Sequence, residues 1–172
     1  SHTLASLMQS QHLMGLVVIQ DGKVRFEHYA PDHAREAPWV TFSVTKSVTS
    51  LLIGAAIQDG YIGSADDPIV KYLPRLEGSK YGQSRIRDIL QMASGMEWNE
   101  DYEDPASDVA IAGAFNGIAL TDYLYEKPRL ATPGARFNYN TAESNLAGEV
   151  LRAAIGMSAG PYLSQKIWQP MG

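Results

Sequence analysis

The stretch Thr41-Phe42-Ser43-Val44-Thr45-Lys46 leads into a run of mostly apolar residues that ends near Ile57. Within this run apolar positions recur three or four residues apart, which predicts a helix that begins at or near Ser43. The positions expected on its inward face are Val44, Val48, Leu51, Leu52 and Ala55. The pattern ends at Asp59-Gly60, because glycine readily takes the left-handed conformation that closes many helices.

A β-hairpin is predicted ahead of this helix. Residues 13–20 are apolar and rich in β-branched side chains, Asp21-Gly22 is a typical two-residue hairpin turn, and residues 23–29 alternate in polarity. The remaining pattern predicts a helical turn at 66–72 and an extended segment at 135–140. It also predicts helices at 86–94, 110–125 (interrupted by two glycines), 141–155 and 158–168. An isolated two-stranded sheet is marginal in water, so we expect further strands to come from elsewhere.

Ser43 and Lys46 are the first candidate chemical groups. They lie three residues apart, and on a helix this spacing puts both side chains on one face. A serine hydroxyl becomes a useful nucleophile once a base takes its proton, and a desolvated lysine can act as that base. Free backbone N–H groups at the helix start would suit a developing oxyanion. The alternative is structural: Ser43 as an N-cap and Lys46 as a solvated first-turn residue.

Composition narrows the possible partners. The chain has 172 residues, a net charge of -5 and no cysteine, and it contains no basic run or basic stripe. This argues against a nucleic-acid partner and excludes disulfides and thiolate chemistry. No apolar run is long enough for a bilayer, so no membrane partner is expected. The N-terminal residues lack a signal-peptide pattern, which favours the cytoplasm only slightly and leaves the compartment open.

Two further sequence patterns do not support the functions with which such patterns are usually associated. Residues 156–160 read Gly-Met-Ser-Ala-Gly and match a nucleophile elbow around Ser158, but a helix precedes them and no histidine follows. A glycine C-cap followed by a serine N-cap explains the same letters. The four histidines show no metal-ligand spacing, so no metal site is expected; they are His2, His12, His28 and His33.

Residues 97–108 form an acidic loop with two aromatic side chains, Trp98 and Tyr102. A solvated surface turn explains such a composition. The functional alternative is the rim of a substrate pocket, because loops that are held by a scaffold often carry binding residues. The residues of the loop leave both interpretations open.

Five stretches together resemble one known superfamily. They read "FSVTKSVTSLLIGAAIQDGYI", "DDPIVKYLP", "IRDILQMASGMEWNEDYEDPASD", "PGARFNYNTAESNLAGEVL" and "YLSQKIWQPMG". In content and order they resemble the serine β-lactamase and penicillin-binding-protein superfamily. Within it they are most similar to the class C-like (family VIII) esterases and the 6-aminohexanoate-dimer (nylon oligomer) hydrolases.

The resemblance implies roles for individual residues. Ser43 would be the acylated nucleophile, with Lys46 as its proton acceptor and its backbone N–H as an oxyanion donor. Tyr139 falls at the tyrosine of the family's Y-x-N motif, which relays a proton between nucleophile and leaving group. Thr141 stands at the asparagine of that motif, which puts β-lactam turnover in doubt more than acylation, and could still donate a hydrogen bond. Tyr102 matches a tyrosine that closes over the substrate amide, which favours the pocket-rim interpretation of the loop.

The resemblance also implies a fold class, α/β (α+β), in which a mostly helical domain interrupts an antiparallel sheet domain. Residues 1–40 would supply a hairpin to the sheet, 41–155 the helical domain, and 156–172 a helix returning to the sheet domain. Family members continue beyond this point with further strands and a third motif. We therefore expect a truncated or cleaved copy, whose sheet a C-terminal fragment or a second copy completes.

The predicted function is hydrolysis of small-molecule esters or small amides through an acyl-enzyme on Ser43, without a cofactor. Esters of short acids come first because they are the easiest acyl donors, small linear amides come second, and β-lactams would acylate slowly. Two alternatives remain: a penicillin-recognising or catalytically silent binding module of the same fold, or an inactive fragment.

Overall fold

The computed structural model describes residues 3–172, so Ser1 and His2, at the start of the segment searched for a signal peptide, lie outside the described residues. The chain divides into two compact units, Ser1–Phe42 and Ser43–Gly172. Within the described residues, no helix combines the length and apolar character needed to cross a bilayer.

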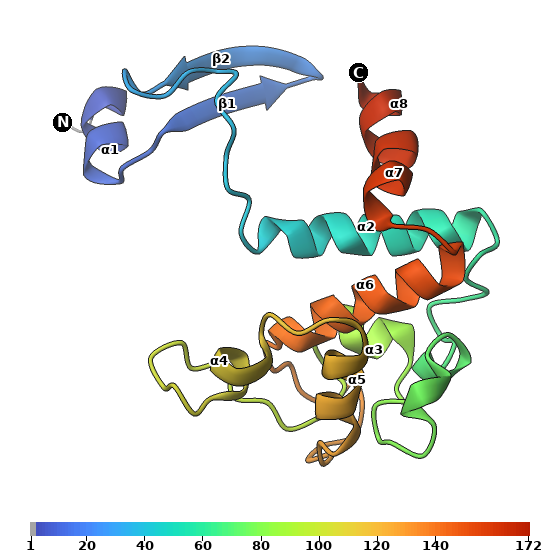
Figure 1. Ribbon diagram of the computed structural model, residues 1–172. Coiled ribbons are helices and arrows are strands. Elements are labelled where there is room, and N and C mark those ends of the chain that lie inside the picture. Colours follow the sequence, from blue (N-terminus) through green and yellow to red (C-terminus); the bar gives the residue numbers. More distant parts are fainter. Residues whose placement is uncertain (1–2) are drawn as a thin grey trace. The chain divides into compact units, whose positions relative to one another are not determined.

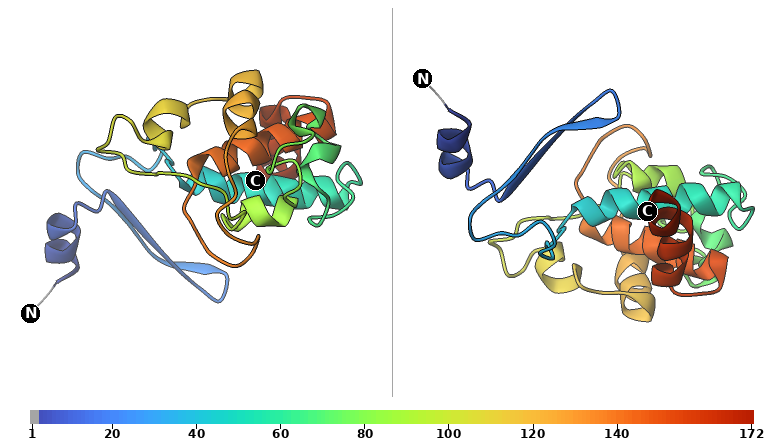
Figure 2. Two further views of the ribbon diagram at one scale, coloured as in Figure 1. Left: turned by 90° about the horizontal axis from the view of Figure 1, so that it is seen from below. Right: turned by 90° about the horizontal axis from the view of Figure 1, so that it is seen from above.

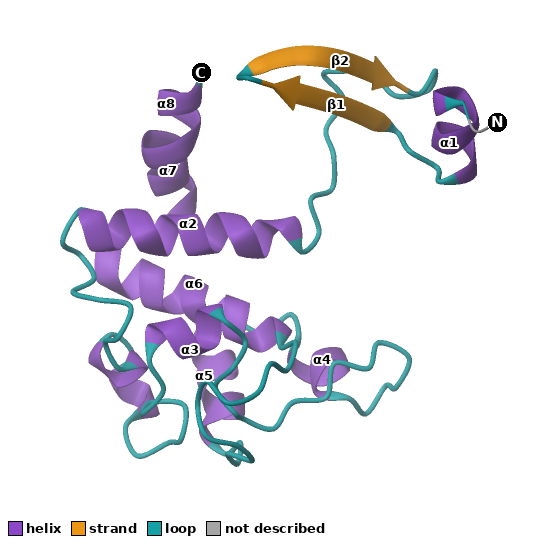
Figure 3. Ribbon diagram, turned by 180° about the vertical axis from the view of Figure 1, so that it is seen from behind, coloured by secondary structure: helices purple, strands orange, loops and turns teal. Residues whose placement is uncertain are grey.

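The first unit contains the predicted hairpin, which is the sheet drawn in orange in Figure 3. Strands β1 (Gly15–Gln20) and β2 (Lys23–Tyr29) pair antiparallel, with an irregularity between Val18 and Ile19. Asp21 and Gly22 join them with φ angles of 53° and 71°, as a tight hairpin turn requires. The predicted hairpin is therefore confirmed.

Helix α1 (Leu4–Ser10) precedes the hairpin and was not predicted from the sequence. It is held at its start by a capping box, in which Thr3 accepts from the amide of Ser6 and the Ser6 hydroxyl accepts from the amide of Thr3. With only 7 residues it is too short to show a recognisable apolar period.

The second unit is built from helices, which Figure 1 shows from teal (α2) to red (α7 and α8). Their bounds are α2 Val44–Gln58, α3 Ile86–Leu90, α4 Asp108–Ala112, α5 Gly117–Tyr125, α6 Thr141–Ile155, α7 Ala159–Leu163 and α8 Gln169–Met171. A π-helical stretch, Ser164–Trp168, links the last two, and 3₁₀ turns span Ile69–Lys71 and Pro74–Leu76. The predicted helical segments are thus present, although several are divided or shorter than expected.

Helices α2 and α6 run side by side through this unit and carry its core (Figures 1 and 2). Helices α3, α5 and α7 pack against α6 as well. The fully buried apolar side chains at these contacts include Ile53, Ala56, Ile86, Ile89, Leu120, Leu124, Leu146, Val150 and Leu151. Burial of this surface is the main stabilising contribution to the pair of helices.

Two details of the sequence prediction were wrong. On α2, Val44 and Leu51 were expected inside but are 64% and 57% exposed. Leu52 is buried as expected, together with Ile53 and Ala56, which were not expected there. The helix carries apolar residues on more than one side, so periodicity alone cannot select the face that packs. The helix expected at 86–94 ends at Leu90.

The turn after α3 explains that early end. Met92 has a φ of 50°, a value outside the helical range, and the amide of Ala93 bonds back to the carbonyl of Asp88 at 2.8 Å. The chain then continues as a loop through residues 93–98, which pairs with a second loop at residues 128–138.

Backbone hydrogen bonds join these two loops and fix the extended segment that leads into α6. The amides of Leu130, Gly134 and Asn138 donate to the carbonyls of Gly95, Ala93 and Met92 at 2.8, 2.7 and 2.8 Å. Gly95 has a φ of +75°, and a Cβ built there would lie 2.0 Å from the carbonyl oxygen of Ala131. Only glycine therefore allows the two loops to approach this closely.

We expect Gly95→Ala to lower the free energy of unfolding by more than about 2 kcal/mol, because it combines a left-handed residue with a backbone clash. Gly156→Ala is the matched control: Gly156 also has positive φ, +68°, but has nothing within 4 Å of a built Cβ. It should cost only about 1–2 kcal/mol. Urea unfolding of both variants measures the difference, and equal losses would show that the contact at Ala131 is unimportant.

Candidate active site

Ser43 stands at the first position of the helical unit, directly before α2. Its backbone is helical, and its side chain makes no capping hydrogen bond to the helix. Phe42, the preceding residue, has a φ of 42°, a left-handed conformation that is rare outside glycine and costs about 1–3 kcal/mol. Lys46 lies one turn further along, and its Nζ is 3.4 Å from the Ser43 Oγ.

Tyr139 approaches the same hydroxyl from a distant part of the sequence. Its phenol donates to the Ser43 Oγ at 2.9 Å, across 96 residues of chain. The Nζ of Lys46 also lies 5.4 Å from the centroid of the Tyr139 ring. The structure therefore brings Ser43, Lys46 and Tyr139 together around one oxygen atom.

The position of Tyr139 follows from the residues on either side of it. Asn138 donates its backbone N–H to Met92 and its side-chain amide to the Trp98 carbonyl at 3.2 Å. Asn140 is the N-cap of α6, and its Oδ1 accepts from the amide of Glu143 at 3.1 Å. Tyr139 is thus held between two anchored neighbours at the point where the extended segment turns into α6.

Tyr102 and Thr141 form a separate group around Glu100. The Tyr102 phenol donates to Glu100 Oε1 at 2.6 Å, and the amide of Thr141 donates to Oε2 at 2.9 Å. The Thr141 hydroxyl and the Trp98 indole N–H donate to the same carboxylate. Neither Tyr102 nor Thr141 has a hydrogen bond to Ser43 among the described contacts.

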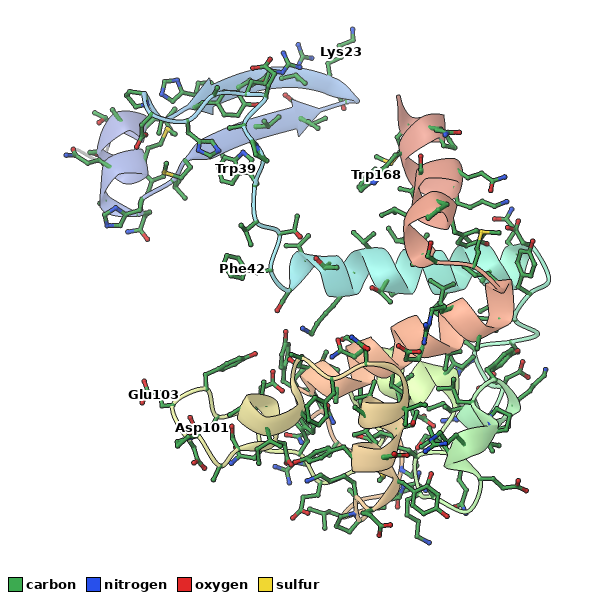
Figure 4. The ribbon with its side chains drawn as sticks, in the orientation of Figure 1. Lys23, Trp39, Phe42, Asp101, Glu103 and Trp168 are labelled. Carbon is green, nitrogen blue, oxygen red and sulfur yellow. The ribbon has the colours of Figure 1, made fainter. Side chains whose placement is uncertain are left out.

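Glu100 thereby ties the acidic loop to the first turn of α6. Burial alone would raise the pKa of its carboxyl, but the hydrogen bonds from Thr141, Tyr102 and Trp98 outweigh that effect and hold the pKa below its usual value. The carboxylate therefore stays charged at neutral pH. Asp101 and Glu103, at the tip of the loop, point outward from it (Figure 4). Sequence reasoning missed the role of Glu100, because nothing in its surroundings separates it from the other carboxylates of the loop.

A hollow of about 140 Å³ lies beside Lys46 and is lined by both hydroxyl-bearing and apolar side chains. Ser47, Ser50 and Ser144 contribute to its wall together with Met92. A space of this size with several polar partners suits one or more water molecules. Across the described residues, no group of three or more potential ligands is arranged to hold a metal ion.

The geometry would allow the Ser43 hydroxyl to be activated. An amine and a phenol within reach of one serine oxygen can accept and return its proton, which is the requirement for covalent catalysis by serine. Hydroxyl protons can rotate, so the contact between Tyr139 and Ser43 can carry a proton in either direction. The absence of a capping bond from Ser43 argues against the purely structural alternative.

Comparison with known proteins identifies a family for this chain. The family model described as Beta-lactamase matches residues 1–172. The chain belongs to the beta-lactamase family. This membership confirms the superfamily resemblance that the sequence motifs suggested.

Individual beta-lactamase relatives match most of this chain but only part of their own length. The 6-aminohexanoate-dimer hydrolase of Paenarthrobacter ureafaciens is 36% identical over 160 residues, covering 88% of this chain and 41% of that protein. A beta-lactamase of Pseudomonas fluorescens is 25% identical over 182 residues, covering 99% and 47%. The chain thus spans less than half the length of these two curated relatives.

A solved class C beta-lactamase from Rhodobacter sphaeroides confirms the fold class. It superposes with a TM-score of 0.70 at 22% identity, covering 96% of this chain and 46% of the other. At this identity the match establishes the beta-lactamase-like fold alone. The mixed α/β character predicted from the sequence is therefore confirmed.

Behind the site of this beta-lactamase family member lies a buried carboxyl that the sequence analysis did not identify. Glu143, in the first turn of α6, is 1% exposed. Its Oε1 accepts from the phenol of Tyr81 at 3.3 Å and from the hydroxyl of Ser94, while Oε2 has no partner. Burial raises the pKa of this carboxyl to about 8, although the hydrogen bonds from Ser94 and Tyr81 act in the opposite direction.

This raised pKa makes stability depend on pH. Between the ordinary value of 4.5 and about 8, the folded protein keeps a proton on Glu143 that the unfolded chain releases. The free energy of unfolding should therefore fall as the pH rises through this interval. At about 1.4 kcal/mol per pKa unit, the total fall is on the order of a few kcal/mol.

Glu143→Gln should remove most of that fall, because the amide is neutral at every pH in the interval. Glu149→Gln is the control: this residue lies further along α6 and bonds to Gly117 and Arg152. Urea unfolding at pH 5, 7 and 9 compares the three proteins. The same decrease with pH in Glu143→Gln as in the wild type would contradict the assignment.

Proposed function

We propose that this protein is a serine hydrolase that cleaves esters or small amides through an acyl-enzyme on Ser43. One observation carries the proposal: the Ser43 Oγ lies 2.9 Å from the Tyr139 phenol and 3.4 Å from the Lys46 amine, and makes no helix cap. Membership of the beta-lactamase family supports it. Because the chain spans less than half of the two curated relatives, the activity of the whole protein is part of the proposal.

The proposed reaction begins when the Ser43 Oγ attacks the carbonyl carbon of the substrate. Its proton passes to the pair formed by Lys46 and Tyr139, and the tetrahedral oxyanion is stabilised by the backbone N–H of Ser43. Tyr139 then returns the proton to the leaving alcohol or amine. In the second half, water attacks the acyl carbon and loses its proton to the same pair. The bond from the acyl carbon to the Ser43 Oγ then breaks, the pair returns the proton to Oγ, and the acid leaves.

Esters of short acids are the proposed first substrates, and small linear amides the second. Esters expel their alcohol more readily than amides expel an amine, so they need less assistance from the site. The relative named 6-aminohexanoate-dimer hydrolase supports the choice of a linear amide. Thr141 stands at the asparagine position of the Y-x-N motif, and its hydroxyl donates to Glu100. For this reason we propose that β-lactams acylate Ser43 slowly rather than serve as good substrates.

Two rivals give different results in one experiment. A silent binding module of the same fold would bind substrate without turnover. The nucleophile-elbow alternative would use Ser158, but Ser158 is the N-cap of α7 and follows α6 through Gly156, so helix rather than strand precedes it. The elbow needs a strand at that position.

The test is labelling with a fluorophosphonate probe, followed by intact mass spectrometry and a p-nitrophenyl ester assay. Wild type and Ser158→Ala should gain one adduct and hydrolyse the ester. Ser43→Ala should gain no adduct and lose at least about a thousandfold in turnover, because the nucleophile is absent. Unchanged turnover in Ser43→Ala would refute the proposal, and labelling without ester turnover would favour the silent module.

A further inference from the structure

The first turn of α6 forms only half of the capping arrangement that its sequence suggests. Asn140 and Glu143 have the spacing of a capping box, in which each side chain binds the backbone amide of the other. One of the two hydrogen bonds is present: the backbone amide of Glu143 donates to Asn140 Oδ1 at 3.1 Å. The Glu143 carboxyl instead turns into the core, toward Tyr81 and Ser94.

A hydrogen-bonded chain returns from this carboxyl to Asn140. The Asn140 Nδ2 donates to the Tyr81 oxygen at 3.0 Å, and the Tyr81 phenol donates to Glu143 Oε1 at 3.3 Å. Both ends of the Asn140 amide are therefore held by Glu143, one directly through its backbone and one through Tyr81. Asn140 is 2% exposed and Tyr81 0%, so water does not compete for these bonds.

Burial and an unpartnered oxygen favour the neutral form of the carboxyl over the charged one. Oε1 receives both hydrogen bonds, whereas Oε2 is buried and has no partner. A proton on Oε2 leaves a neutral group there. A negative charge would instead be buried with one oxygen unsatisfied, which is strongly unfavourable. Opening the first turn of α6 to water would relieve such a charge.

We propose that Glu143 is a positioning residue for Tyr139: the neutral carboxyl fixes Asn140 through Tyr81, and ionisation releases this turn and withdraws Tyr139 from Ser43. The inference rests on the proposed function, because Tyr139 matters there as the proton relay. It adds a group, four residues after Tyr139 in the sequence, that sets the upper pH limit of the site.

The charges around Glu143 favour the same form. Asp88 of α3 raises its pKa further, and is itself paired with Arg85 at 2.8 Å. The remaining ionisable side chains on α6 and on the elements packed against it contact other groups or are exposed: Lys46 (with Ser43), Asp59 (with Lys166 and Tyr162), Arg87 (with Asp66), Asp108 (with Lys127 and Tyr123), Asp122 (with Arg75), Glu149 (with Arg152) and Tyr125 (exposed). No cation among these described contacts bonds to the Glu143 carboxyl.

The test measures the second-order rate of Ser43 labelling by a fluorophosphonate at pH 6.5 and pH 9. The quantity compared is the ratio of the rate at pH 9 to that at pH 6.5. In Glu143→Gln this ratio should be at least tenfold higher than in the wild type, because the variant cannot ionise. Glu149→Gln, a matched substitution on the same helix, should keep the wild-type ratio. Equal ratios in Glu143→Gln and the wild type would overturn the proposal.

A second measurement separates this inference from the proposed function. Hydrogen exchange of a peptide covering residues 138–144, corrected for the intrinsic effect of pH, reports on the turn directly. The wild type should lose protection between pH 6.5 and pH 9, and Glu143→Gln should keep it. If neither the wild type nor the variants are labelled at Ser43, but exchange depends on pH as predicted, the proposed function fails and the pH-dependent positioning by Glu143 is still supported. Equal loss of protection in the wild type and Glu143→Gln refutes the pH-dependent positioning by Glu143.

Discussion

The side chain of Asn140 is held at both ends, and the placement of Tyr139 depends on this. Its Oδ1 caps the first turn of α6 through the amide of Glu143, and its Nδ2 bonds to Tyr81 in a fully buried setting. A buried amide that lost either partner would carry an unsatisfied polar group, at a cost of about 1–3 kcal/mol. The direction in which the chain enters α6 is therefore strongly determined, and with it the position of the phenol next in sequence.

The proposed site arises where the starts of two packed helices meet. Ser43 and Lys46 are placed by local geometry, since they share one face of α2. Tyr139 arrives at the start of α6, which packs against α2. The loop carrying Glu100 is joined to the same turn through Thr141. Packing of α2 against α6 thus brings the three side chains of the proposed site together, and the loops form the surroundings of these side chains.

The sequence revealed the helices at 44–58 and 141–155 because each shows a clear apolar period and a glycine near its end. It placed the inward face of α2 only partly correctly: Leu52 is buried, but Leu51, which fits the same apolar pattern, lies on a side that stays exposed. The nearness of Ser43 and Lys46 followed from spacing, whereas Tyr139, 96 residues away, could be associated with them only by family resemblance. The burial of the Glu143 carboxyl could not be predicted, because Asn140 and Glu143 have the spacing of an ordinary capping box.

The most direct measurement of the central claim is a double-variant cycle on Lys46 and Tyr139, with the labelling rate of Ser43 as the readout. If both side chains act on the same proton, Lys46→Met and Tyr139→Phe should each slow labelling by about 10²–10⁴, and the double variant should be little slower than the slower single variant. If the two losses instead multiply, the side chains act independently, and the account of one shared site around Ser43 is wrong.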